Sequence, residues 1–246
     1  MSEKLSELSQ TDKCKIQAAQ KAAKENIFDG FIVGVGTGST IKFFIKALSE
    51  LVTEEELDIV VVPSSIETHL ELVRSGLSVN TLIEYPELDV YVDSADIITN
   101  DYTLIKGGGG ALTMEKIMSK AAQEFMVIAD DSKYPRKITD FPVPIELIPL
   151  AINTIVQPIF NLGGEFYLRY SKGKEGPLIS DNGNVIGDIN FKESYNSIIM
   201  EKELNSIPGI IENGIFSSGT HKIIIGHHDS AEIVFTQNSD SKKLLK

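Results

Sequence analysis

The sequence predicts an α/β protein with a mostly parallel, Rossmann-like sheet that has helices on both faces, plus a smaller α+β ferredoxin-like lid domain. In the first half, short apolar runs alternate with amphipathic helical segments, which is typical of a parallel sheet. Three prolines within 141–149 then interrupt this pattern and indicate a boundary. Beyond them, the order strand, helix, two strands, helix, strand resembles a split βαβ unit. We therefore expect a catalytic domain at 1–140, completed by 217–246, and a lid or dimerisation domain at 141–216.

Hydrophobic periodicity predicts the individual elements of both domains. The first domain should contain helices at 11–26, 41–51, 67–75 and 112–122, and strands at 31–35, 58–62, 78–83, 89–92 and 125–129. The lid should contain strands at 143–148, 165–170 and 210–216, a hairpin within 178–191, and helices at 150–162 and 194–206. Short strands at 223–226 and 233–236 should return to the first domain.

Charge and composition narrow the classes of function for these 246 residues. Lys plus Arg number 23 and Asp plus Glu number 35, so the net charge is 23 − 35 = −12. Such an acidic chain is a poor general nucleic-acid or anionic-membrane binder. The single cysteine, Cys14, cannot form an intramolecular disulfide and is interpreted as a packing residue in a reducing compartment. No signal peptide or membrane-spanning apolar run is recognised, so we expect a soluble, cytoplasmic protein.

The most informative stretch is Lys106-Gly107-Gly108-Gly109-Gly110, followed by a predicted helix that carries Glu115. Glycines leave a bare backbone that can adopt positive φ, and a helix N-terminus presents N–H groups to an anion. A cation and a carboxylate flank these donors. This combination of residues is suited to proton transfer next to a carbonyl group.

A second glycine-rich turn, Gly36-Thr37-Gly38-Ser39-Thr40, lies between a strand and a helix, as in phosphate-binding loops. A Walker loop would need a lysine before Ser39, and the dinucleotide fingerprint would need a glycine at that position. Neither nucleotide motif is present. The loop is therefore interpreted as a hydroxyl-rich site for one terminal phosphate.

Two further strand ends carry polar groups. Asp93-Ser94-Ala95-Asp96 follows one predicted strand, and Asp130-Asp131-Ser132-Lys133 follows another. Parallel α/β sheets hold their ligands at this edge. By contrast, His227-His228-Asp229 is interpreted as a solvated turn, because adjacent histidines on extended backbone point apart. No metal site is predicted.

These motifs, in this order, resemble those of the type A ribose-5-phosphate isomerases over nearly the whole chain after the first ten residues. The resemblance rests on 34–40, 91–96, 106–116, 129–133 and 141–146. It implies interconversion of ribose 5-phosphate and ribulose 5-phosphate through an enediol, in the non-oxidative pentose phosphate pathway. It also implies that no metal or organic cofactor takes part, and that the chain forms a homodimer or a dimer of dimers.

The resemblance assigns roles to the residues of these motifs. Glu115 would be the base that moves a proton between C2 and C1. Asp93, Asp96 and Lys106 would bind sugar hydroxyls, assist ring opening and stabilise the enediolate, and Lys133 would join the loop in holding the phosphate. The expected substrate-binding set is Thr37, Gly38, Ser39, Thr40, Asp93, Ser94, Ala95, Asp96, Lys106, Gly107, Gly108, Gly109 and Lys133.

The sequence departs from the family pattern at two positions. The family's aspartate motif normally reads Asp-Gly-Ala-Asp-Glu, but here Ser94 replaces the glycine and Ile97 the final acid. A positive φ at position 94 would disfavour serine. The change at 97 would alter the field around Asp96.

Two other classes of protein remain as alternatives. A non-catalytic sugar-phosphate sensor could share a related fold, but its usual DNA-binding segment is missing from the N-terminal thirty residues. A deaminase or CoA-transferase-like enzyme could share the architecture, but has no reason to keep Lys106, the glycines and Glu115 together. Formation of ketose from ribose 5-phosphate would separate all three.

Overall fold

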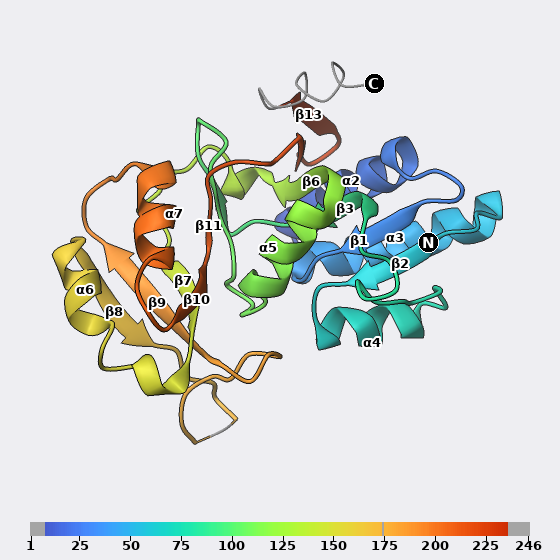
Figure 1. Cartoon of the computed structure of the whole chain (residues 1–246). Helices are drawn as coiled ribbons and strands as arrows, with labels where there is room; N and C mark the ends of the chain where they lie inside the picture. Colours follow the sequence, from blue (N-terminus) through green and yellow to red (C-terminus); the bar gives the residue numbers. More distant parts are fainter. Residues whose placement is uncertain (1–7, 174, 236–246) are drawn as a thin grey trace, which may run out of the picture. The chain divides into compact units, whose positions relative to one another are not determined.

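A computed structural model describes residues 8–173 and 175–235 of the chain (Figure 1). Contacts divide the chain into two compact units. Among the described residues, the first comprises 8–94, 117–134 and 219–235, and the second comprises 95–116, 135–173 and 175–218. The ends of the predicted first domain, 1–7 and 236–246, lie outside the described residues.

The first unit contains the mostly parallel sheet that the sequence predicts, in the order β13-β12-β6-β3-β1-β2. Every neighbouring pair is parallel except β12 and β13, which are antiparallel. The strands are β1 (Ile32–Val35), β2 (Val60–Pro63), β3 (Leu88–Asp93), β6 (Ala122–Asp130), β12 (Lys222–Gly226) and β13 (Ala231–Phe235). The helices are α2 (Gln10–Asn26), α3 (Ser39–Glu55) and α4 (Ile66–Arg74), and α5 (Leu112–Ala121) ends in this unit after beginning in the second.

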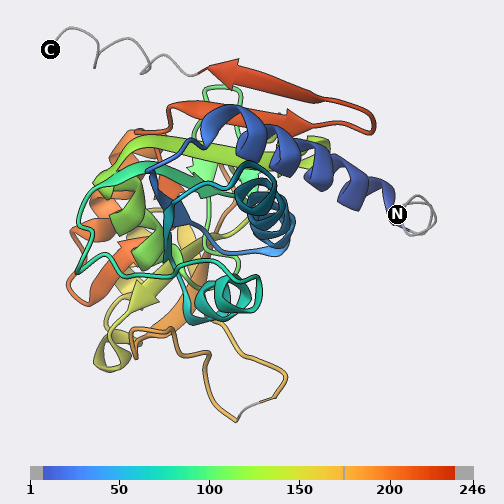
Figure 2. The ribbon, with the colours of Figure 1, turned by 90° about the vertical axis from the view of Figure 1, so that its right-hand side faces the viewer.

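Helices cover both faces of this sheet, as predicted. Val33 and Val35 lie in the core that includes apolar residues of α2 and α3, and Figure 2 shows these two helices side by side. Gly34 points to the opposite face, because successive strand residues alternate. There a methyl group on Gly34 would come within 3.0 Å of the Met118 side chain of α5.

The second unit contains the predicted ferredoxin-like arrangement. Its four-stranded sheet is antiparallel throughout, in the order β10-β7-β9-β8. The chain order is β7 (Val143–Leu147), α6 (Val156–Asn161), β8 (Gly164–Leu168), β9 (Val185–Phe191), α7 (Ser197–Asn205) and β10 (Ile210–Asn213). This is a split βαβ unit with its fourth strand beside its first.

A three-stranded antiparallel sheet, β11-β5-β4, completes the second unit. It contains β4 (Ile97–Ile98), β5 (Leu104–Ile105) and β11 (Ile215–Phe216). Ile97, Ile105 and Ile215 belong to the same apolar core as β7 and β9. Segment 95–116, which the sequence analysis placed in the first domain, therefore packs with the second unit.

The strand predicted at 78–83 is wrong. Only a single bridge, between Val61 and Val79, joins this segment to the sheet. Thr81 accepts a hydrogen bond from the backbone N–H of Ile83 at 3.2 Å and turns the chain. The side chain of Ile83 is exposed, so the last apolar residue of the predicted strand does not contribute to a buried core.

The helix predicted at 150–162 is also wrong over its first half. A short 3₁₀ turn, η2 (Pro149–Ala151), precedes α6, which begins only at Val156. Pro158 has no backbone N–H and fits only the first turn of a helix, where that group needs no partner. It therefore sets the start of α6 close to residue 156.

Two predicted strands of the lid are shorter or divided. The run 210–216 splits at Gly214 into β10 and β11, which belong to different sheets. A methyl group on Gly214 would lie 2.2 Å from the Lys106 carbonyl oxygen, so the chain passes very close to that backbone. In the hairpin predicted within 178–191, only β9 is a strand, and Ile179 makes a single bridge to Val185.

We expect Gly226→Ala to destabilise the first unit. A methyl group on Gly226 would lie 1.8 Å from the carbonyl oxygen of Cys14, so α2 would have to move away from β12. The free energy of unfolding should fall by about 2 to 3 kcal/mol in urea denaturation followed by circular dichroism. Gly173→Ala, whose added methyl would meet nothing within 4 Å, is the matched control and should unfold like the parent. Equal urea midpoints for the two variants would contradict this packing.

Candidate active site

The polar strand ends of the first unit lie along one edge of its sheet. Strands β6, β3, β1 and β2 are consecutive and parallel, so their C-terminal ends meet at the same side. These ends lead into Asp131–Lys133, Asp93, the loop 36–40 and Ser64, respectively. The three polar clusters predicted from the sequence in this unit are thus brought to a common edge.

Asp93 is the centre of this edge. Its side chain is fully buried, and one oxygen accepts hydrogen bonds from the backbone N–H groups of Thr37 (3.1 Å) and Ser94 (2.7 Å). The other oxygen accepts from the hydroxyl of Tyr91 at 2.5 Å. A methyl group on Gly36 would lie 1.9 Å from Asp93 Oδ1, so the glycine allows the loop to approach the carboxylate.

Four hydroxyl side chains gather behind the loop. Thr37 Oγ1 lies 2.8 Å from both Ser64 Oγ and Ser65 Oγ and 3.1 Å from Thr68 Oγ1. Thr68 in turn donates to the carbonyl oxygen of Gly36 at 2.7 Å. The sequence analysis missed the roles of Ser64, Ser65 and Thr68. The two serines follow the strand predicted at 58–62 after a single proline, and this position at a strand end could have indicated their role.

Two lysines of this unit lie at or next to its polar motifs. Lys15 of α2 donates to Ser39 Oγ at 3.1 Å. Lys133 is half-buried in the 3₁₀ turn η1 (Asp131–Lys133), which begins where Asp130 accepts a hydrogen bond from the Ser132 N–H at 3.1 Å. Lys133 was predicted from the sequence, whereas Lys15 was missed because it lies 24 residues before Ser39.

In the second unit, Lys106 and Glu115 form a buried ion pair. Lys106 Nζ lies 3.2 Å from Glu115 Oε2, and the two side chains are 2% and 4% exposed. Lys106 follows β5, and Glu115 lies in the first turn of α5. Since burying either charge alone is costly, the pair holds both side chains in place. The structure therefore brings together the cation and the carboxylate that flank the glycines in the sequence.

The glycine turn between these residues is rigidly built. Gly107 and Gly110 have φ values of +95° and +82°, which favour glycine. Gly110 N–H bonds the Gly107 carbonyl (2.9 Å), and Gly108 N–H donates to half-buried Asp96 (2.8 Å). Two of the four backbone donors that the sequence suggested for a ligand are thus used inside the turn.

Arg169, at the end of β8, was missed by the sequence analysis. Its guanidinium donates to the carbonyl oxygens of Gly107 (3.0 Å) and Gly108 (2.9 Å) and forms an ion pair with Asp188. Nothing local in the sequence links residue 169 to a turn more than sixty residues earlier. Its effect is to hold the carbonyl side of the turn.

In the histidine turn after β12, each imidazole lies near carboxylates, and His227 Nε2 lies 3.8 Å from Glu232. His227 Nδ1 lies 3.9 Å from Asp131, and His228 Nδ1 lies 2.6 Å from Asp229. Within 8–173 and 175–235, no group of three or more His, Cys, Asp or Glu residues has the geometry to hold a metal ion. Among the same residues, no helix is long and apolar enough to cross a membrane.

These features define the class of the protein. A parallel sheet with a hydroxyl-rich loop at the ends of its strands, and a second unit with a buried lysine–glutamate pair, are typical of an α/β enzyme. The family model for ribose 5-phosphate isomerase A (phosphoriboisomerase A) matches residues 60–230. The chain belongs to this family.

Close relatives agree over most of the chain. The ribose-5-phosphate isomerase A of Methanothermobacter thermautotrophicus is 41% identical over 220 residues, which cover 89% of this chain and 96% of the relative. That of Pyrococcus abyssi is 42% identical over 214 residues, covering 85% and 92%.

Solved structures agree as well. Ribose 5-phosphate isomerase A from Methanocaldococcus jannaschii matches with a TM-score of 0.87 at 37% identity, covering 92% of this chain and 99% of that one. A D-ribose-5-phosphate isomerase in complex with phospho-erythronic acid matches with a TM-score of 0.89 at 38% identity, covering 92% and 100%.

We expect Tyr91→Phe to weaken the edge around Asp93. The substitution removes only the hydroxyl that donates to Asp93 Oδ2, while the ring keeps its stacking on Phe125 at 5.3 Å. A hydrogen bond to a charged group is worth about 1.5 to 3 kcal/mol, so the free energy of unfolding in urea should fall by that amount. Tyr85→Phe is the control, because that hydroxyl has no partner among the described residues. Identical unfolding of both variants would mean that the Tyr91 hydroxyl does not stabilise Asp93.

Proposed function

We propose that this protein interconverts D-ribose 5-phosphate and D-ribulose 5-phosphate through an enediolate, with Glu115 as the base. The observation that carries the proposal is the buried pair of Glu115 and Lys106, 3.2 Å apart. An aldose–ketose isomerase needs one carboxylate that shuttles a proton and one electrophile beside the developing oxyanion. Family membership supports the same reaction, because the relatives named above are ribose-5-phosphate isomerases.

The proton balance follows from this pair. In the open-chain aldose, Glu115 removes the proton from C2, and the electron pair of that C–H bond forms the C1–C2 double bond. Negative charge then develops on O1, where the Lys106 ammonium stabilises it and where a proton is taken up. Return of the Glu115 proton to C1, with loss of the O2 proton, gives the ketose. No net proton or electron is gained or lost.

The phosphate of the substrate is assigned to the first unit. Thr37, Ser39 and Thr40 offer hydroxyls, Gly38 offers close backbone approach at the start of α3, and Lys133 and Lys15 offer charge. Binding energy from this remote group would position C1 and C2 against the acid–base pair. Because these hydroxyls and lysines are grouped locally, a chain of net charge −12 could still bind an anion there.

The two aspartates are assigned to the sugar. Asp96 is half-buried and accepts a hydrogen bond from the Gly108 N–H, and in this proposal its carboxylate also accepts from a sugar hydroxyl and assists ring opening. Asp93 is fully buried and already accepts three hydrogen bonds. A substrate hydroxyl could join these donors or exchange with one of them. The backbone at Ser94, Ala95 and Gly107 to Gly109 would line the same substrate.

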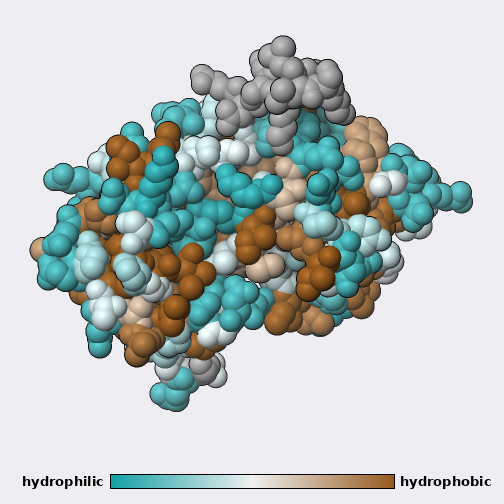
Figure 3. Space-filling view, viewed as in Figure 1, coloured by the Kyte–Doolittle hydropathy of each residue, from teal (hydrophilic) through white to brown (hydrophobic). Residues whose placement is uncertain are grey.

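The second unit supports a further part of the proposal, assembly into a homodimer or a dimer of dimers. Its exposed apolar side chains include Leu150 (91% exposed), Phe160 and Ile199. Figure 3 shows brown hydrophobic side chains among teal hydrophilic ones on the visible face of this unit. Exposed apolar patches of this kind mark association surfaces.

A cytoplasmic location fits the metabolic reaction and the single buried cysteine.

Glu115→Gln is the decisive test of the proposed base. Glutamine keeps the size and hydrogen-bonding shape of glutamate but cannot take up the C2 proton. We expect kcat for ribose 5-phosphate to fall by about 10²- to 10⁴-fold or more. Exchange of the substrate C2 hydrogen with deuterated solvent, followed by NMR, should be lost in parallel. Glu50→Gln, an exposed carboxylate on α3, is the control and should behave as the parent. Near-parental exchange in a folded Glu115→Gln variant would move the role of base to Asp93 or Asp96.

Lys133→Ala tests the phosphate end. Loss of a cation that contacts the phosphate removes binding made equally in the ground state and the transition state. KM for ribose 5-phosphate should therefore rise by about tenfold or more with kcat little changed. Lys46→Ala, an exposed lysine on α3, is the matched control. An unchanged KM in steady-state assays would remove Lys133 from the phosphate site.

A further inference from the structure

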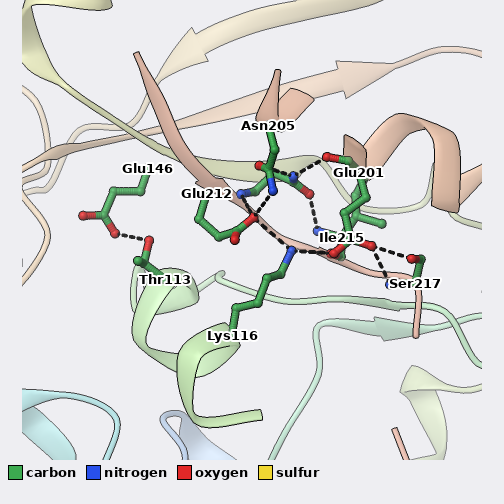
Figure 4. A network of polar contacts seen from close by, with 9 residues as sticks. Thr113, Lys116, Glu146, Glu201, Asn205, Glu212, Ile215 and Ser217 are labelled. Carbon is green, nitrogen blue, oxygen red and sulfur yellow. Dashed lines mark hydrogen bonds and ion pairs between the residues drawn. The ribbon is translucent and has the colours of Figure 1, made fainter. Parts of the chain in front are cut away.

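The helical turn that carries Glu115 is anchored on both sides of that residue. Thr113 Oγ1 donates to Glu146 at 2.5 Å, and Lys116 Nζ bonds three acceptors (Figure 4). Residues 113 and 116 are three apart and lie on one face of α5, whereas Glu115 points about 100° away from Lys116. The anchors therefore fix the helix without occupying the direction in which the Glu115 carboxylate points.

Lys116 is the stronger of these anchors. Its ammonium lies 2.9 Å from Glu201 of α7, 3.1 Å from Glu212 of β10 and 2.6 Å from the carbonyl oxygen of Ile215 in β11. The side chain is almost completely buried. A single group thus ties the first turn of α5 to three other elements of the second unit.

The two carboxylates that hold Lys116 are themselves fixed. Ser217 donates its backbone N–H (3.1 Å) and its hydroxyl to Glu201, and Asn205 Nδ2 donates to Glu212 (2.8 Å). Burial raises the pKa of Glu201, but the charge of Lys116 and the hydrogen bonds from Ser217 and Lys116 outweigh it and keep that pKa below its ordinary value. Glu201 is therefore ionised at neutral pH and the contact is charge-assisted.

Strand β11 links Lys116 to the other member of the acid–base pair. It pairs with β5, which leads into Lys106, and the Lys106 N–H donates to the Gly214 carbonyl just before β11 at 2.9 Å. The ring of Phe216 in β11 lies 4.7 Å from Lys116 Nζ and 5.6 Å from Lys106 Nζ. Lys106 and Lys116 therefore both contact β11. Lys106 is a member of the buried pair, and Lys116 is the neighbour of Glu115 in the sequence.

We propose that Lys116 is a positioning residue that sets the geometry of Glu115 against Lys106 through β11. The inference rests on the proposed role of Glu115 as the base. Lys116 itself does not touch the reacting atoms in this assignment, since its ammonium is enclosed by Glu201, Glu212 and Ile215. A displacement of about 1 Å in a catalytic group can cost on the order of 100-fold in rate, so loss of the anchor acts on kcat.

The test compares three variants of the full chain. Lys116→Met keeps the length of the side chain but removes the charge and the donors. The triple variant Lys116→Met, Glu201→Gln, Glu212→Gln removes the anchor without leaving carboxylates unpaired. Lys120→Met, an exposed lysine one turn further along α5, is the matched control.

Two measurements are made on each variant. Steady-state kinetics with ribose 5-phosphate should show a fall in kcat of about 10- to 100-fold in both Lys116 variants, with KM within about twofold of the parent. Amide hydrogen exchange, followed by mass spectrometry, should be faster at 104–106 and 112–116 in both Lys116 variants and unchanged in Lys120→Met. If Lys116 only stabilised the fold, its loss would not lower kcat while leaving KM unchanged.

The outcomes separate this inference from the proposed function. If the triple variant recovers the parental kcat, unpaired carboxylates and not lost positioning cause the defect, and the proposal is overturned. Unchanged exchange at 112–116 in Lys116→Met would overturn it as well, even if the parent enzyme did not act on ribose 5-phosphate. In contrast, a parent without isomerase activity but with faster exchange in the Lys116 variants would refute the proposed function and leave the anchor in place.

Discussion

The second unit is organised around the cost of burying the charges of Lys106 and Glu115. Removing one partner of a buried ion pair costs about 3 to 5 kcal/mol, so the fold must hold both side chains together. The glycine turn between Lys106 and Glu115 brings the two side chains close together. Gly107 needs positive φ, and a methyl group there would meet Leu112 at 2.8 Å, so only glycine lets the chain pass from β5 into α5 in so short a space. The glycines therefore serve a fixed geometry and not flexibility.

The first unit uses a single carboxylate for a related purpose. The Asp93 carboxylate accepts hydrogen bonds from the backbone N–H groups of Thr37 and Ser94 and from the hydroxyl of Tyr91. These bonds fix the start of the loop that precedes α3. These donors satisfy a carboxylate that is fully buried. Two lysines lie near the same loop and strand ends: Lys15 pairs with Asp12 and donates to Ser39, and Lys133 lies in η1. The second unit thus places two opposite charges side by side, whereas the first surrounds a buried carboxylate with hydrogen-bond donors.

Local patterns explain which features the sequence could predict. Lys106, the glycines and Glu115 lie within ten residues, and the loop 36–40 directly follows an apolar strand, so periodicity and turn chemistry were sufficient. The split βαβ order of the second unit was predictable for the same reason. Lys15, Arg169 and the contact of Lys116 with β11 depend on residues from 24 to 99 positions apart. The failed elements at 78–83 and 150–162 were apolar runs that a side-chain turn and a proline interrupted.

The two departures from the family motif can now be explained by packing. Ser94 is not among the non-glycine residues with positive φ, which in the described part of the chain are Glu56 and Tyr102, so serine carries no strain there. Its N–H instead donates to Asp93. Ile97 is buried in the core of the second unit and pairs with Ile105 in β4 and β5. A carboxylate at 97 would need its own partner in that core. The isoleucine therefore removes a buried charge three residues after Ser94 and leaves Asp96 as the acidic side chain beside the glycine turn.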